Sequence, residues 1–383
     1  MNRGFSLYLD FARVSAAIVV LFSHFAYPWA SGGGLLWIRE LNLGSDAVVL
    51  FFVLSGLVIA HTTTVKDRSI GSYALARASR LYSVAIPALV LSLVCAGLVQ
   101  RINPGQYPDF DAVSAAAQIV RGLTFTNYIW WDSQRIVANG PYWSVSYEFW
   151  YYALFGAAFF LRGSARIWVP ALIALFIGPK ILLLAPCWLT GVYVYRRLQG
   201  GLAERITAGR GWRMALGPAV AYAALLAMNA PLKLKVLTWE MTGHVHPGVL
   251  FSFSDEFIWN FVLAILCAIH FIGVAAIVRN GSRPLEAGAK AIRWISGRTF
   301  SLYLCHMPLL KLGSNLPGYR SENPLHAAAL LVGAVAICLV IAEFTERRLP
   351  VWRDMIGGVA DGIARLVRQR RRPRADVKSE LQI

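Results

Sequence analysis

The chain has 383 residues, of which 57% are hydrophobic and 15% charged, with a mean hydropathy of +0.53 and a formal net charge of +17. Soluble domains rarely exceed about half apolar residues, so this composition excludes an ordinary soluble protein. A high positive charge also occurs in nucleic-acid-binding proteins, but here the basic residues are spread over short loops between apolar segments. We therefore predict an all-α, polytopic integral membrane protein with no nucleic-acid partner.

A transmembrane helix needs about 20 mainly apolar residues, and this length predicts about ten spans. Two of the loops between them are long and lie on the outer side, 101–140 and 231–256. The first span is expected to remain in the mature protein, because residues 26–30 continue the apolar pattern without a signal-peptide cleavage site. The short fifth and sixth segments predict a re-entrant pair or a tight hairpin. The ten segments are 8–28, 45–62, 81–100, 142–161, 166–178, 180–195, 214–230, 257–277, 299–316 and 326–345.

The basic residues predict the orientation of these spans. With the N-terminus in the cytoplasm, 27 Lys and Arg residues lie on the cytoplasmic side and nine on the other side, while Arg13 lies inside the first span. Cytoplasmic loops carry the excess of Lys and Arg, so we expect both termini in the cytoplasm. Residues 1–352 form the predicted membrane domain. Residues 353–383 form a basic cytoplasmic tail, in which 365–374 is predicted to be a disordered arm held by anionic lipid headgroups.

Three ionisable residues lie in the first span: Asp10, Arg13 and His24. Asp10 and Arg13 are three residues apart on one helix face and can form an ion pair, either as a structural anchor or as part of a site. His24 lies about 16 Å further along the helix, at about 1.5 Å rise per residue. A histidine can take and return a proton near neutral pH, but one in this position can equally well reach the membrane interface.

The next two spans carry further polar groups. Asp46 begins the second span at the level of His24, whereas Ser55 and Gly56 in mid-span are more typical of close helix packing. Arg77 and Arg80 lie at the cytoplasmic mouth of the third span. They are either ordinary positive-inside residues or a clamp for phosphate, for which guanidinium is the preferred group.

In the fourth span, which Gly140 and Pro141 introduce, Glu148 lies about two turns from the outer side among the aromatic residues of YWSVSYEFWYYALF. A buried carboxylate there either pairs with a basic residue or handles protons. His306 lies in the ninth span, and the HVH stretch at 244–246 has no further ligand nearby. The five cysteines lie in apolar segments without CxxC spacing, so we expect neither a structural disulfide nor a metal site.

Six stretches follow one another in the order LDFARVSAAIVVLFSHF, DAVVLFFVLSGLVIAH, RASRLY, YWSVSYEFWYYAL, ISGRTFSLYLCHMPLL and EFTERRLPVW. Together they resemble the acyltransferase 3 family of membrane-bound acyltransferases over about residues 7–352. Members of this family move an acyl group, most often acetyl, from a cytoplasmic donor to a carbohydrate outside the membrane. The resemblance implies acetyl-CoA as donor substrate, a carbohydrate or lipid-linked glycan as acceptor, membrane lipids as surroundings, and the bacterial inner membrane as location.

The resemblance also implies roles for particular residues, because three family motifs match this chain. The first motif, Arg-x10-His with a preceding acidic residue, matches Arg13 and His24 with Asp10. The second, Arg-x-x-Arg, matches Arg77 and Arg80. The third, Trp-Ser-x-Ser-x-Glu, matches Trp143, Ser144, Ser146 and Glu148. The implied catalytic residues are His24, Glu148 and Asp46. The implied donor- and substrate-binding residues are Arg13, Arg77, Arg80, Asp10, Trp143 and Ser146.

The chain departs from the family pattern at two positions. Asp46 lies one turn before the Phe-Phe pair that the family aspartate directly precedes, and Tyr147 replaces a second acidic residue near Glu148. We also expect no fused periplasmic hydrolase-like domain, so the membrane domain would complete the transfer alone.

The family mechanism gives Arg13 and His24 a joint purpose. Coenzyme A phosphates on the arginines would place the acetyl group near His24, because the pantetheine arm has the same general length as the Arg13–His24 separation. His24 would act as general base on an acceptor hydroxyl or would accept the acetyl group covalently. Glu148 or Asp46 would orient His24 or position the acceptor.

Two other functions remain open from the sequence. A secondary transporter exporting an anionic metabolite or glycan would also carry charges and broken helices at mid-membrane, although the sequence shows no inverted repeat. A scaffold for polysaccharide assembly would leave the buried charges unexplained. The acyl group could be acetyl, succinyl or longer, and the sequence carries no signal for an oligomeric state.

Overall fold

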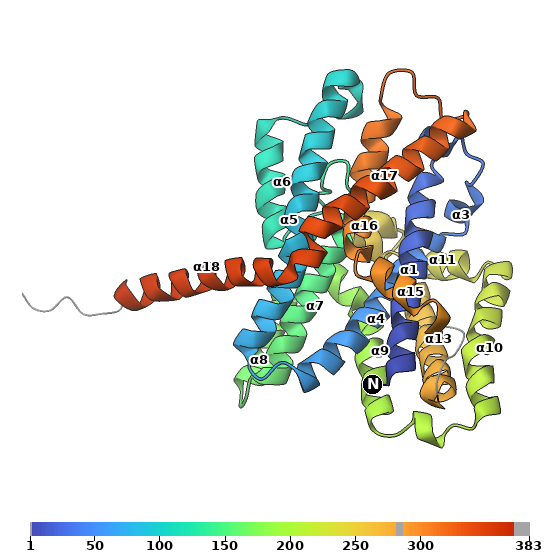
Figure 1. Cartoon of the computed structure of the whole chain (residues 1–383), viewed down its shortest axis with the longest axis vertical. Coiled ribbons are helices and arrows are strands. Elements are labelled where there is room, and N and C mark those ends of the chain that lie inside the picture. The colour runs from blue at the N-terminus through green and yellow to red at the C-terminus, as the bar shows by residue number, and fades with distance from the viewer. Residues whose placement is uncertain (1, 281–285, 371–383) are drawn as a thin grey trace, which may run out of the picture.

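The computed structural model describes residues 2–280 and 286–370, and all regular elements in these ranges are helices (Figure 1). The longer helices are α1 (Arg3–Phe25), α4 (Leu43–Val65), α5 (Ile70–Ile102), α6 (Ala112–Thr124), α7 (Tyr142–Phe160), α8 (Ala165–Ile177), α9 (Pro179–Gln199), α10 (Ala208–Ala227), α11 (Ala230–Met241), α13 (Phe257–Ile277), α16 (Thr299–Ser314), α17 (Pro324–Phe344) and α18 (Leu349–Arg370). The shorter helices are α2 (Pro28–Ser31), α3 (Trp37–Glu40), α12 (Pro247–Phe251) and α15 (Ala289–Ser296).

Several of these helices can cross a membrane. By length and composition, five stretches of the described residues qualify, and a sixth does if the bent pair α10 and α11, which meet at 65°, counts as one span. The five stretches are Arg3–Phe25, Leu43–Val65, Ile70–Ile102, Gly248–Ile277 and Pro324–Gly362. The chain is therefore an all-helical, multi-pass membrane protein, while ten spans with both termini in the cytoplasm stay a prediction.

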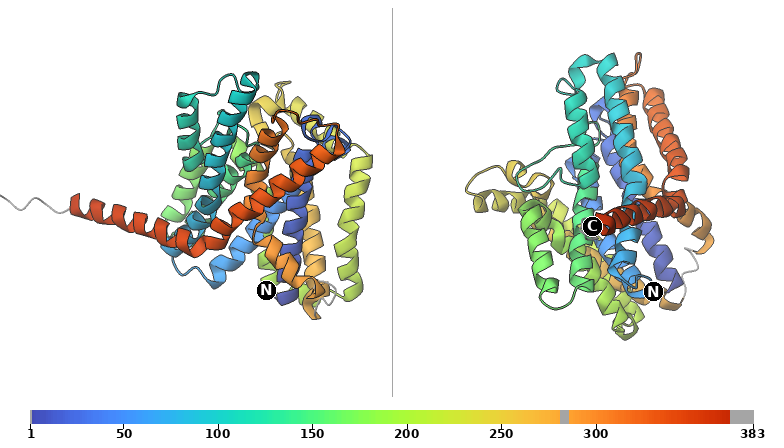
Figure 2. Two further views of the ribbon diagram at one scale, coloured as in Figure 1. Left: turned by 45° about the horizontal axis from the view of Figure 1, so that its top comes forward. Right: turned by 90° about the vertical axis from the view of Figure 1, so that its left-hand side faces the viewer.

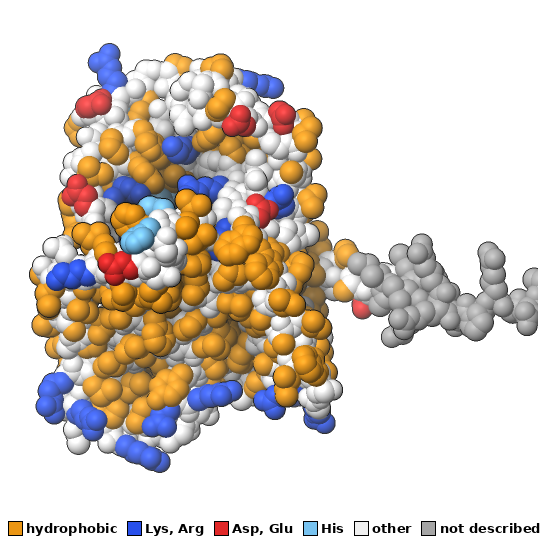
Figure 3. Space-filling view, turned by 180° about the vertical axis from the view of Figure 1, so that it is seen from behind, with side chains coloured by type: hydrophobic (Ala, Val, Ile, Leu, Met, Phe, Trp, Pro, Cys, Tyr) orange, Lys and Arg blue, Asp and Glu red, His pale blue; other side chains and the backbone are white. Residues whose placement is uncertain are grey.

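The surface has the polarity expected of a protein in a bilayer. On the face shown in Figure 3, apolar side chains cover most of the lower half of the molecule, and the edge below them carries Lys and Arg. Large apolar residues face outward along the peripheral helices: Ile167 of α8 is 71% exposed and Val332 of α17 is 67% exposed. Lipid tails rather than water can cover such surfaces, because burial in hydrocarbon removes apolar area from water.

Helices α4 and α9 are in direct backbone contact at the centre of the bundle. A Cβ atom added to Gly56 would lie 1.9 Å from the carbonyl oxygen of Trp188, and one added to Gly191 would lie 2.0 Å from that of Val53. Small residues permit this close approach of membrane helices. The prediction that Ser55 and Gly56 serve close helix packing is confirmed for Gly56, whereas the hydroxyl of Ser55 donates a hydrogen bond to Glu148 of α7.

Two further predictions, about the fifth and sixth spans and about the outer loops, can be compared with the structure. The fifth and sixth predicted spans form a tight hairpin of α8 and α9, which turns at Gly178 with a positive φ of 76°. The two predicted outer loops contain helices that the hydropathy pattern missed, α6 and α11. A local signal for α6 was present, because Asp111 and Ser114 form a capping box at its N-terminus.

The predicted disordered arm is wrong for residues 365–370, which belong to helix α18; residues 371–374 lie outside the described residues. Helix α18 runs across the predicted domain boundary at residue 352 and extends beyond the bundle (Figures 1 and 2). Val351, Met355 and Val359 recur every four residues on it and are exposed. This spacing is that of an amphipathic helix, a pattern that the emphasis on basic residues concealed.

Candidate functional site

Two cavities lie end to end between the helices. We call the first, of about 420 Å³, the arginine cavity, because Arg13, Arg77 and Arg80 line it. We call the second, of about 640 Å³, the histidine cavity, because His24 lines it. Val48 and Tyr303 line both cavities and form a shared wall. Helix α1 therefore supplies Arg13 to one cavity and His24 to the other, at the separation that the helix rise predicts.

The arginine cavity is strongly cationic. Its lining contains five basic side chains and two carboxylates, namely Arg13, Lys66, Arg77, Arg80 and Arg353 against Asp67 and Glu148. The sequence interpretation included three of these cations and missed Lys66 and Arg353. Arg353 was missed because it comes from α18, which the sequence analysis had assigned to a tail. An excess of cations in a partly enclosed site favours a polyanionic ligand.

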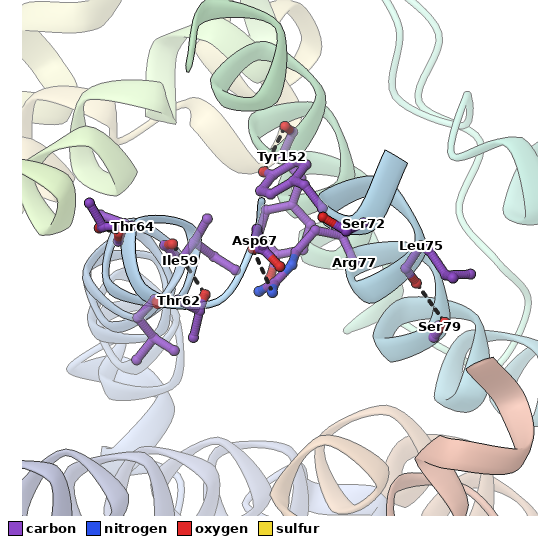
Figure 4. Close-up of polar contacts among 12 residues, drawn as sticks. Ile59, Thr62, Thr64, Asp67, Ser72, Leu75, Arg77, Ser79 and Tyr152 are labelled. Atoms are coloured by element: carbon purple, nitrogen blue, oxygen red, sulfur yellow. Dashed lines mark hydrogen bonds and ion pairs between the residues drawn. The ribbon is translucent and has the colours of Figure 1, made fainter. Parts of the chain in front are cut away.

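The arginines differ in how far they are already neutralised. Arg77 Nη2 lies 3.4 Å from Asp67 Oδ2, and Asp67 points from the α4–α5 connection toward Arg77 on α5 (Figure 4). Arg13 Nη1 lies 3.5 Å from Asp10 Oδ1, which is the ion pair that their spacing predicts. Arg80 forms no ion pair within the described residues. The buried Nε of Arg77 also has no hydrogen-bond partner there, so both groups are available to a ligand.

Glu148 faces the arginine cavity from α7. Its Oε1 accepts hydrogen bonds from Ser55 Oγ, at 2.5 Å, and from the hydroxyl of Tyr152. Trp188 Nε1 in turn donates to Ser55 Oγ at 3.1 Å. The carboxylate is thus held by neutral donors from its own helix and from α4, and His24 is not among its partners.

The partner of His24 is His306 on α16. His306 Nδ1 lies 2.8 Å from the carbonyl oxygen of Leu302, which can only accept, so this nitrogen carries the proton. His306 Nε2 is then an acceptor, and His24 Nδ1, at 2.9 Å, donates to it. This arrangement leaves His24 Nε2 without a proton. Sequence reasoning noted His306 as a polar residue but missed the pair, because no spacing along the chain relates α1 to α16.

Three of the predicted site residues line neither cavity: Asp10, which forms the ion pair with Arg13 described above, Asp46 and Ser146. Asp46 accepts hydrogen bonds from Tyr222 Oη at 2.6 Å and from Trp259 Nε1 at 2.9 Å, and so joins α4 to α10 and α13. Ser146 donates to Asn127 Oδ1 at 2.6 Å and joins α7 to the segment that precedes it. The hydrogen bonds of Asp46 and Ser146 therefore connect helices and segments of the bundle to one another.

Two other residues of the same motif do line the cavities. Trp143 lines the histidine cavity with its ring stacked on Phe253 at a centroid distance of 4.6 Å. Ser144 lines the arginine cavity, and its Oγ lies 2.8 Å from the hydroxyl of Tyr303 in the shared wall. Tyr303 was absent from the sequence interpretation, although it lies in the matched stretch ISGRTFSLYLCHMPLL.

The histidines of the HVH stretch have ordinary structural contacts. His246 Nδ1 accepts from the backbone N–H of Gly248 at the start of α12, and His244 packs edge-on against Trp239. Among the described residues, no group of three or more His, Cys, Asp or Glu side chains could hold a metal ion. The five cysteines are free thiols.

Comparison with known proteins gives consistent matches. The chain is 27% identical over 379 residues to peptidoglycan O-acetyltransferase OatA of Listeria monocytogenes serovar 1/2a, an alignment that covers 90% of this chain and 55% of that protein. It is 25% identical over 340 residues to acyltransferase MdmB of Streptomyces mycarofaciens, with 80% of each chain covered. The chain thus spans about half the length of OatA. No solved structure matches significantly.

A family model described as an acyltransferase domain, Acyl_transf_3, matches residues 6–343, which include most of α1 and all residues that line the two cavities except Leu349 and Arg353. The resemblance seen in the six sequence stretches is therefore confirmed over nearly the whole chain. The chain belongs to the acyltransferase 3 family of membrane acyltransferases.

Proposed function

We propose that this protein is a membrane O-acyltransferase of the bacterial inner membrane, which moves acetyl from cytoplasmic acetyl-CoA to a hydroxyl of an extracytoplasmic carbohydrate. The observation that carries the proposal is the pair of cavities that share the Val48–Tyr303 wall, one cationic and the other containing an unprotonated histidine nitrogen. The names of two relatives, an O-acetyltransferase and an acyltransferase, support the same reaction class.

The arginine cavity suits the donor. Coenzyme A carries its phosphates at one end and its thioester at the other, so cations at one end of a long site and a reactive group at the other match its chemistry. Arg80 and the free Nε of Arg77 would bind phosphate, because guanidinium binds phosphate with charge-assisted hydrogen bonds. The pantetheine arm would then run past Ser144 toward the wall at Tyr303.

The histidine cavity suits the acceptor. As the acceptor hydroxyl oxygen bonds to the thioester carbonyl carbon, His24 Nε2 takes its proton. The carbon–sulfur bond then breaks, the electron pair leaves with the coenzyme A sulfur, and His24 returns the proton to that thiolate. His306 holds His24 in the tautomer that leaves Nε2 free and stabilises the charge that forms on the ring. In a variant of this scheme, His24 accepts the acetyl group covalently first.

The other predicted catalytic residues take supporting places in this proposal. Glu148, in the arginine cavity, would position the donor or the Ser55 and Tyr152 hydroxyls around it. Asp46 would act through the packing of α4 against α10 and α13. The orientation of His24 is assigned to His306 instead of to either carboxylate.

The proposal can be tested with three bacterial strains that carry the wild-type gene, a deletion, or a His24→Ala variant. Proton NMR of surface polysaccharide should show alkali-labile acetyl signals in the wild type alone, and the chemical shifts would identify the acylated sugar. The His24→Ala protein must be present in the membrane at the wild-type level. Unchanged acetylation in that strain would refute the mechanism. Transport without consumption of acetyl-CoA by the purified protein would refute the function.

A further inference from the structure

Three basic side chains line the histidine cavity, and each lies over an aromatic ring. The Arg39 guanidinium carbon is 3.5 Å from the ring centroid of Tyr27, that of Arg135 is 5.3 Å from Phe253, and Lys311 Nζ is 3.9 Å from the ring of Trp29. These cations come from α3, from the segment before α7, and from α16. They are far apart in sequence, and the mechanism proposed above uses none of them.

These three cations have no acidic partner in the described part of the chain. None of Arg39, Arg135 and Lys311 belongs to an ion pair there, and Asp109 is the one acidic residue among the described residues that line the cavity. The adjoining cavity of about 290 Å³ provides a contrast, because Lys235 in it is neutralised by two carboxylates. Basic groups that outnumber the acidic groups of a cavity favour an anionic ligand.

Aromatic rings connect this cationic group to His24. The ring of His24 stacks on Tyr27 at a centroid distance of 6.5 Å, and Tyr27 stacks on Trp29 at 5.3 Å. Arg39 and Lys311 lie over the second and third rings of this series. These rings therefore hold Arg39 and Lys311 near His24 through cation–π contacts.

We propose that the acceptor is an acidic saccharide, whose carboxylate or phosphate binds Arg39, Arg135 and Lys311 while a hydroxyl of the same or the next sugar reaches His24 Nε2. This inference rests on the proposed function, because it treats the histidine cavity as the acceptor site. It adds the substrate class: neutral glycans would lack the group that these three cations bind. In the space-filling view, basic side chains lie around a hollow in the upper half of the molecule (Figure 3).

The test is equilibrium binding to the full-length protein in nanodiscs without acetyl-CoA, measured by microscale thermophoresis. The three probes are trigalacturonate, its carboxyl-reduced neutral form, and maltotriose 1-phosphate. We expect at least one anionic probe to bind about tenfold or more tightly than the neutral probe, and the tighter of the two identifies the anion as carboxylate or phosphate. If neither anion binds more tightly than the neutral form, the inference is wrong.

Matched variants separate the site from the general charge of the protein. Arg135→Gln and Lys311→Gln should each weaken binding of the preferred anion about tenfold, the effect of losing one charge-assisted hydrogen bond. Arg101→Gln removes the same charge from the exposed end of α5, away from the cavity lining, and should leave binding unchanged. Equal losses in all three variants would show a diffuse electrostatic effect and overturn the inference.

The outcome can be distinguished from failure of the proposed function, because binding is measured without the donor. Selective binding of an acidic saccharide by a protein that transfers no acetyl group would refute acyl transfer and leave the anion site in place. Acetyl transfer to glycans without any preference for acidic ones would refute the anion site and leave the transferase in place.

Discussion

The pairing of His24 with His306 makes a prediction about the His306→Ala variant. In the ground state, His24 Nδ1 donates to His306 Nε2 at 2.9 Å as a neutral group. In the transition state proposed above, His24 carries a positive charge. A hydrogen bond between neutral groups contributes about 0.5–1.5 kcal/mol, and one that involves a charged group about 1.5–3 kcal/mol. Only the difference, about 1–1.5 kcal/mol, accelerates the reaction.

We therefore expect His306→Ala to lower kcat about tenfold, while the KM for acetyl-CoA stays near its wild-type value. The KM should stay because His306 does not line the arginine cavity. His306→Gln should recover most of the rate, since its side-chain carbonyl can accept a hydrogen bond from the Nδ1–H group of His24. The assay is the initial rate of radiolabelled acetyl transfer by purified protein over a series of acetyl-CoA concentrations.

Thermal unfolding of both variants is the control for a packing defect, because His306 is completely buried. A lower melting temperature shared by both variants, with kcat restored in the glutamine variant alone, would still support the hydrogen bond. A His306→Ala protein with wild-type kcat would refute the reasoning, since His306 is the side chain that accepts the hydrogen bond from His24 Nδ1.

Three further predictions follow from single contacts. Arg80→Ala should raise the KM for acetyl-CoA about tenfold with little change in kcat, because Arg80 lines the arginine cavity without an ion pair of its own among the described residues and is free to bind a donor phosphate. An unchanged KM in saturation kinetics would contradict this prediction. Gly56→Ala should destabilise the protein by roughly 1–3 kcal/mol through overpacking against the Trp188 carbonyl, and a thermal melt identical to wild type would be inconsistent with that contact. Asp46→Asn should lower the melting temperature and leave kcat near its wild-type value, because it weakens two hydrogen bonds that join helices. A large loss of kcat with an unchanged melting temperature would instead indicate that Asp46 is a catalytic residue.

Features that depend on neighbours along one helix could be predicted from the sequence. The apolar segments predicted a multi-pass helical protein, and the rise of a single helix set the separation of Arg13 from His24. The spacing of three residues predicted the Asp10–Arg13 ion pair. Pro141 lies directly before α7, as predicted from its effect on a helix start. In each case local geometry is sufficient, because backbone hydrogen bonds within a helix span only four residues.

Tertiary structure alone decided which of these groups meet. His24 and His306 are 282 residues apart, and Ser55 and Glu148 are 93 apart; no periodicity relates such positions. For the same reason, the sequence placed Asp46 at the same membrane depth as His24 but could not show that its side chain faces α10 and α13. A helix shows from its sequence how far apart its side chains lie, but the packing of neighbouring helices decides which face each one presents to a cavity, because that packing depends on the combined shapes of several helices.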